Sequence, residues 1–202
     1  PRVLLGWITG STLAICGLVF QALFRNPLAS PDMLGVSTGA AFGAVLYIRL
    51  GLAFSLFGIS GLSFAAFAGA LLATFAIYLA GTVKRGGMSE GTLLLAGIAM
   101  SFLFGSANMI VQYSGGYTDT FRMMRWSMGG IQTGGFSSVW ATLPALAAIL
   151  VTALVSSREL DLFGCGEEIA AGRGVAGSRL RKLLRTIASL VAGVQLGDCG
   201  AP

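Results

Sequence analysis

The sequence has no histidine and only three cysteines, so two side chains that commonly bind transition metals are absent or scarce. Cys16 lies in an apolar run, Cys165 in a polar segment and Cys199 near the end of the sequence, and no CxxC pair occurs. This spacing indicates neither a metal site nor a disulfide framework. We therefore expect no metal centre, no haem, no thiol redox site and no other cofactor.

Charged residues are also scarce, at 10% of the sequence, whereas soluble domains carry roughly a quarter. Hydrophobic residues make up 55%, and the mean hydropathy is +0.82. This composition excludes an ordinary soluble protein. Because a helix needs about 20 residues to cross a bilayer, the length allows about five or six crossings. We expect residues 1–202 to form a single transmembrane domain.

The sequence lacks the motif of an ATP-hydrolysing subunit. Its lysines are Lys84 and Lys182, and neither belongs to a GxxxxGK[ST] phosphate-binding loop. The eight acidic residues lie at span ends or in polar segments, whereas ion-coupled transporters place ionisable groups inside their spans. We therefore expect a protein that is not an enzyme. If it uses ATP, a separate subunit hydrolyses it.

Long apolar runs predict an all-α fold, a polytopic transmembrane helical bundle with about five full spans and the start of a sixth. Polar stretches at 114–125 and 158–185 are expected to be loops. The predicted spans are 3–24, 33–50, 62–81, 92–113 and 139–155, followed by the incomplete run 186–196.

Small residues recur at every fourth position in two of these spans, and such stripes let helices approach closely. The stripes are Gly35, Gly39 and Gly43 in one span, and Gly97, Ser101 and Gly105 in the other.

The basic residues divide unequally if the spans alternate in direction. Nine fall on the side that holds the 158–185 segment, and four fall on the other: Arg2, Arg49, Arg122 and Arg125. The positive-inside rule then places the 158–185 segment in the cytoplasm and residue 1 outside. The basic balance indicates membrane topology and lipid contact, with no nucleic acid as a partner.

The run QALFRNPLASPDMLGVSTGAA, residues 21–41, resembles the signature of the FecCD-type permeases. Segments 93–99, 126–130 and 166–170 agree in the same order. The resemblance implies the membrane subunit of an ABC importer for ferric siderophores, haem or cobalamin, located in a bacterial inner membrane. It implies a fold of about ten helices, of which this sequence would cover the second to the start of the seventh. The implied partners are a second permease subunit, an ATPase subunit and a substrate-binding protein.

The resemblance gives the 158–185 segment a role as the cytoplasmic coupling loop that docks on the ATPase. Two short helices are expected there, the second capped by Ser178. The alternative is a solvated loop that only satisfies the positive-inside rule. The residues expected to contact the ATPase or shape the loop are Gly166, Glu167, Glu168, Ala170 and Gly174.

Other residues match further parts of the family pattern. Arg2 stands where the family carries an outward arginine that pairs with the binding protein, although a lipid-headgroup anchor is a close alternative. Ser89 and Thr92 match a cytoplasmic gate. Ser101, Asn108 and Gln112 could face the pathway or form hydrogen bonds between helices.

The signature itself is interpreted first as architecture and second as a coupling surface. Asn26 and Pro27 are expected to form a tight turn in which Asn26 bonds nearby backbone, and Ser30 to Asp32 are expected to start the next helix. The signature residues of this turn are Gln21, Asn26, Pro27, Leu28, Ala29, Pro31 and Gly35.

The resemblance ends after Ala192, where the family continues through a glycine-rich stretch, whereas this sequence reads QLGDCGAP from Gln195 to Pro202. A shifted reading frame or truncated gene would explain the difference, and we expect that this sequence alone does not transport. An inert or structural membrane fragment is therefore one alternative, and a channel or secondary transporter is another. The substrate stays open among siderophore, haem and cobalamin complexes, with siderophores preferred by family frequency.

Overall fold

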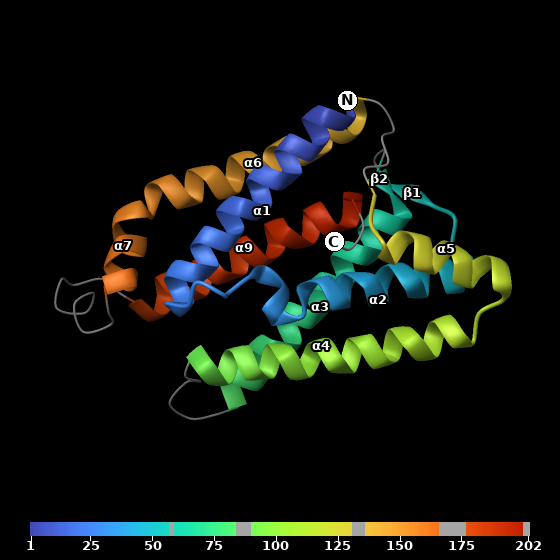
Figure 1. Ribbon diagram of the computed structural model, residues 1–202, viewed down its shortest axis with the longest axis horizontal. Helices are drawn as coiled ribbons and strands as arrows, with labels where there is room; N and C mark the ends of the chain where they lie inside the picture. Colours follow the sequence, from blue (N-terminus) through green and yellow to red (C-terminus); the bar gives the residue numbers. More distant parts are fainter. Residues whose placement is uncertain (57–58, 84–89, 131–135, 166–176, 200–202) are drawn as a thin grey trace.

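The computed structural model describes residues 1–56, 59–83, 90–130, 136–165 and 177–199 (Figure 1). The predicted all-α class is confirmed, because the described β-structure is limited to two antiparallel strands of two residues each. In chain order the elements are α1 (Arg2–Phe24), η1 (Pro31–Leu34), α2 (Val36–Arg49), β1 (Ser55–Leu56), β2 (Ile59–Ser60), α3 (Gly61–Val83), α4 (Glu90–Tyr113), α5 (Tyr117–Ser127), α6 (Phe136–Val155), α7 (Ser157–Cys165) and α9 (Gly177–Cys199).

Four helices in the described part of the chain are long and apolar enough to cross a membrane, namely α1, α3, α4 and α6. The second predicted span is shorter than expected. Its first residues form the 3-10 turn η1, which Gly35 ends at a φ of 68°, so that α2 begins only at Val36. With 14 residues, α2 is about 21 Å long, against a hydrocarbon core of about 30 Å.

The stretch 114–125, expected to be a loop, instead contains most of α5. Asp119 in the first turn and Arg125 in the last turn complement the helix dipole, and Met123 is fully buried. This stretch is an amphipathic helix whose polar composition does not indicate a helix from sequence alone.

The expected polar loop at 158–185 is also partly helical. Its first residues belong to α7, which buries Leu160 and Phe163 on one side and carries Glu159 in its first turn. Its last residues belong to α9, which runs as one helix from Gly177 to Cys199. The prediction that Ser178 caps a separate short helix is therefore wrong.

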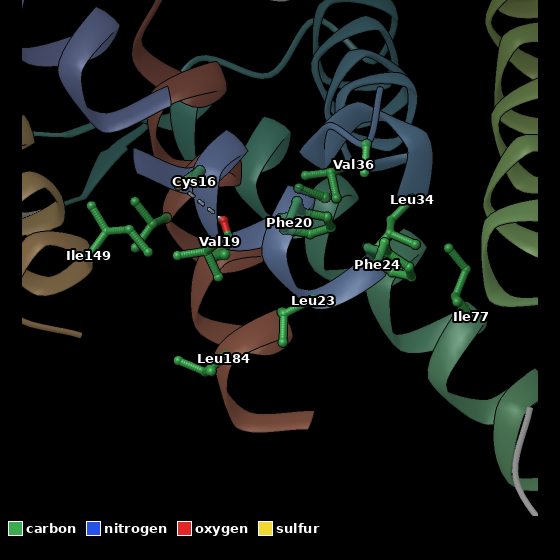
Figure 2. Close-up of a cluster of buried hydrophobic side chains, with 14 of the residues drawn as sticks. Cys16, Val19, Phe20, Leu23, Phe24, Leu34, Val36, Ile77, Ile149 and Leu184 are labelled. Carbon is green, nitrogen blue, oxygen red and sulfur yellow. Dashed lines mark hydrogen bonds between the residues drawn. The ribbon is translucent and has the colours of Figure 1, made fainter. Parts of the chain in front are cut away.

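Helix α1 is central to the packing, because it contacts α6, α7, α9 and η1. Figure 2 shows Phe20 and Phe24 of α1 pointing toward Leu34 of η1 and Val36 of α2. The two phenylalanine rings stack with centroids 5.7 Å apart. The buried cluster also includes side chains from α3, α6 and α9, so α1 links most of the helices through one apolar core.

Helices α2 and α3 pack backbone to backbone at glycine residues, as the small-residue stripe predicts. A Cβ placed at Gly43 would lie 2.1 Å from the carbonyl oxygen of Ala65, and one at Gly69 would lie 2.1 Å from that of Gly39. Gly35 differs from the prediction, because it precedes the helix and its Cβ position faces Ser101 of α4.

Helices α1, α2, α3, α4, α6 and α9 alternate in direction along the chain, whereas α5 is a short extra helix that runs the same way as α6 (Figure 1). The start of α1, the end of α2 and the β1–β2 hairpin lie at the end of the bundle from which α5 returns, which we call the outer end. The end of α1, the end of α3, the start of α4 and α7 lie at the opposite end, which we call the inner end. This arrangement agrees with the alternation on which the charge argument depends. The cytoplasmic placement of the inner end stays a prediction.

Candidate functional site

The signature turn after α1 is closed by its own backbone and by Asn26. Arg25 adopts a left-handed conformation with φ 49°, and its N–H and that of Asn26 both donate to the carbonyl oxygen of Gln21. The Asn26 Oδ1 atom accepts a hydrogen bond of 2.9 Å from the Leu28 N–H, and Ala29 N–H donates to the Asn26 carbonyl at 3.0 Å. The predicted bond between Asn26 and nearby backbone is therefore present.

This turn has an anchored part and an exposed part. Ala29 and Pro31 are buried, whereas Pro27 is exposed and Leu28 is 75% exposed. The Asn26 bond fixes the backbone that presents Pro27 and Leu28 at the inner end. An exposed leucine on a fixed turn suits contact with a partner, and that role stays a prediction.

The rest of the signature packs on α4. A Cβ at Gly97 of α4 would lie 2.0 Å from the carbonyl oxygen of Met33, so only glycine permits this approach. Asp32 accepts a hydrogen bond from the Ser37 hydroxyl, which joins η1 to the first turn of α2. The signature therefore connects the end of α1 with both α2 and α4.

The predicted polar residues of α4 lie on the side that packs against the signature and α2. The Asn108 Nδ2 atom donates to the Thr38 carbonyl of α2 at 3.3 Å, and Asn108 is 7% exposed. Ser101 bonds the Gly97 carbonyl within its own helix at 3.0 Å. For Asn108, this geometry favours a bond between helices over a pathway position.

Gln112 and Thr92, both half-buried, lie toward opposite ends of α4. The Gln112 carbonyl accepts a hydrogen bond of 3.0 Å from the Thr120 hydroxyl of α5. Ser89, the other predicted gate residue, lies outside the described residues. The gate and pathway roles of these residues stay predictions.

Sequence reasoning looked for polar pathway residues and missed the exposed apolar face of α4. The sequence signal for this face is a pair of large apolar residues, Phe102 and Leu103, that is repeated seven positions later at Met109 and Ile110. The large exposed residues of α4 are Leu95 (66%), Ile98 (42%), Phe102 (73%), Leu103 (61%), Met109 (75%), Ile110 (70%) and Tyr113 (95%).

Sequence reasoning also missed a buried polar cluster between α1 and α9. The Gln195 Nε2 atom donates to the Thr12 hydroxyl at 3.2 Å, and the Thr9 hydroxyl donates to Gln195 Oε1 at 3.2 Å. One turn further along, the Cys16 thiol lies 3.6 Å from the Ala188 carbonyl (Figure 2). Gln195 is 1% exposed, so its amide finds its partners inside the bundle and fixes α9 against α1.

The remaining predicted residues lie at the two ends of the bundle. Arg2 is exposed in the first turn of α1, at the outer end. The coupling residues Gly166, Glu167, Glu168, Ala170 and Gly174 lie outside the described residues. Their described flanks are the end of α7 and the start of α9.

The chain matches the model of the FecCD transport family over residues 1–201. It belongs to that family. One relative is the cobalamin import system permease protein BtuC of Halobacterium salinarum, 38% identical over 100% of this chain and 53% of the relative. Another is the iron(3+)-hydroxamate import system permease protein FhuG of Bacillus subtilis, 32% identical over 95% of this chain and 58% of the relative.

A solved structure also resembles this FecCD chain, with a TM-score of 0.87 and 27% identity. It is described as an inward-facing conformation of an ABC transporter assigned to the metal-chelate type. The match covers 99% of this chain and 62% of the solved chain. The chain thus spans somewhat more than half the length of the relatives it matches. With its family and its apolar helices, it is a multi-pass protein of the inner membrane.

Proposed function

We propose that this chain is the central part of a permease subunit in an ABC importer, which moves a metal chelate or a corrinoid inward. The observation that carries the proposal is the family match over residues 1–201. The relatives named above import cobalamin and iron(3+)-hydroxamate complexes, which supports a chelate as substrate. Ferric siderophores are the preferred class.

In this proposal ATP is hydrolysed by a separate subunit. Residues 158–185 form the coupling loop within a single permease domain, residues 1–202. Two observations support this position. The helix α7 and the signature turn lie together at the inner end, and Leu28 stands exposed there beside the end of α1. The ATPase would contact Glu167 and Glu168 and the exposed side of the turn.

The opposite end would receive the substrate-binding protein through Arg2. The exposed face of α4 would meet the solute path and the second permease subunit. Phe102 and Tyr113 of α4 are 73% and 95% exposed in this chain, so this apolar face is open to lipid or to another helix.

The coupling assignment predicts loss of the ATPase from a Glu167→Lys/Glu168→Lys variant. Reversing two charges at a docking loop places like charges against the partner surface, which we expect to lower ATPase retention at least about tenfold. The measurement is affinity purification of the tagged, complete permease in mild detergent, followed by quantitative mass spectrometry.

Arg2→Glu is the matched control, because it reverses a charge at the outer end. It should keep the ATPase and lose the binding protein. Equal ATPase retention by the parent and the double lysine variant would contradict the coupling assignment. Failure of the complete permease to retain any ATPase would contradict the importer proposal itself.

A further inference from the structure

Helix α5 returns along the bundle from its outer end. The preceding helix, α4, has 24 residues and is about 36 Å long, slightly more than a hydrocarbon core of about 30 Å. After a short turn, the 11 residues of α5 run back for about 16 Å beside α2, roughly parallel to α4 (Figure 1). Buried Met123 faces the bundle. The last turns of α5 therefore lie within the outer half of the membrane.

The exposed side of α5 combines cationic and aromatic side chains. Arg122 and Arg125 are exposed and three positions apart, so they share one side of the helix. Beside them lie Tyr117, 92% exposed, and Phe121, 61% exposed. Within the described part of the chain, neither arginine forms an ion pair. Asp119, half-buried in the same helix, is three positions before Arg122 and therefore lies beside Arg122 but away from Arg125.

Lipid is a poor environment for this side of α5. Arginine in the hydrocarbon region costs several kcal/mol, and such residues usually face a water-filled cavity or the bundle interior. An amphipathic helix that binds headgroups lies in the membrane plane, whereas α5 runs alongside the spans (Figure 1). Arg122 and Arg125 thus require water, an anionic solute or a polar surface from the rest of the permease.

We propose that this face of α5 lines the outer part of the solute path and selects anionic metal chelates over neutral ones. The inference rests on the importer function proposed above and adds the charge of the substrate to it. Guanidinium groups form paired hydrogen bonds with carboxylate and catecholate oxygens. Tyr117 and Phe121 supply a surface for the planar groups of such chelates. A neutral chelate gains little from either arginine.

The first test measures the electrostatic field beside Phe121 in the complete importer, reconstituted with its ATPase and binding protein in lipid vesicles. The parent has Cys16, Cys165 and Cys199 replaced by serine, and the probe is Phe121→Cys. Two membrane-impermeant thiosulfonate reagents are compared, one anionic and one cationic. Adding Arg122→Gln and Arg125→Gln should lower the anionic-to-cationic rate ratio by about tenfold.

The matched control is Val151→Cys on α6, which is 58% exposed on a span of apolar composition and should react with neither reagent. An unreactive Phe121→Cys would show that this face of α5 does not meet water. A rate ratio that the glutamine substitutions leave unchanged would show that the arginines do not act on the solute. Either result would overturn the inference.

The second test asks whether the site distinguishes chelates. A negatively charged ferric tris-catecholate complex should slow modification of Phe121→Cys at least about threefold, whereas a neutral ferric trihydroxamate at equal concentration should not. The glutamine substitutions should remove this protection. Equal protection by both complexes, or by neither, would contradict selection by charge. The cysteine-modification tests address only the role of α5. The importer proposal is tested by a separate measurement of ATP-dependent uptake, so the two can fail independently.

Discussion

Replacement of Gly43 by leucine is expected to prevent the close packing of α2 on α3 and to destabilise the protein by about 3 kcal/mol or more. A Cβ at this position would lie 2.1 Å from the Ala65 carbonyl oxygen and 2.9 Å from its carbon. Both are backbone atoms, so no side-chain rotation relieves the clash. The measurement is the thermal unfolding midpoint in mild detergent, followed by fluorescence-detected size exclusion.

The matched control is Gly10→Leu in α1, because nothing lies within 4 Å of the Cβ position of Gly10. This variant should unfold close to the parent or slightly above it, since leucine favours helix more than glycine does. A Gly43→Leu protein as stable as the Gly10→Leu control would show that α2 and α3 are not packed backbone to backbone.

The second large effect is expected from Phe20→Ala in the core. Phe20 is fully buried at the centre of the cluster in Figure 2 and stacks on Phe24. Because lipid is itself apolar, the loss comes mainly from the cavity and the missing contacts. We expect a cost of about 2 to 3 kcal/mol.

Leu18→Ala is the control, because Leu18 lies on the same helix and is 57% exposed. It should change the unfolding midpoint little in the same assay. Equal losses for Phe20→Ala and Leu18→Ala would indicate that α1 is not the central helix of the bundle. A cost for Phe20→Ala below about 2 kcal/mol would mean that neighbouring side chains move in and fill the cavity left by the ring.

The features that could be predicted from sequence are those that depend on neighbouring residues. Apolar runs of span length identify the long helices, because only a helix satisfies its own backbone in lipid. The Asn26 turn follows from the local chemistry of Asn-Pro, and Gly39 and Gly43 follow from four-residue spacing.

The features that could not be predicted depend on contacts between distant elements. Whether Asn108 faces a pathway or Thr38 depends on how α4 packs, and spacing alone does not fix that rotation. The composition of residues 114–125 indicates a polar connection and not α5, because the buried side of this helix is narrow. The four-residue spacing places Gly35 in a helix, although its left-handed backbone ends the turn before α2.

The two ends of the bundle carry different side chains. The proposal that the outer end receives the binding protein and the inner end contacts the ATPase agrees with that difference. The outer end carries Arg2, Arg122 and Arg125, which suit anionic partners or solutes. The inner end carries the hydrogen-bonded signature turn and the flanks of the coupling segment. The apolar core around α1 joins the two ends, so movement at one end can be transmitted to the other through packed helices.

The most direct test of the importer proposal is uptake of a radioactive metal chelate or corrinoid by vesicles that contain the complete permease, its ATPase and its binding protein. We expect accumulation that requires ATP hydrolysis, increases with the binding protein, and is abolished by Glu167→Lys/Glu168→Lys. Accumulation that proceeds without ATP and follows an ion gradient, or that the double lysine variant leaves unchanged, would contradict it.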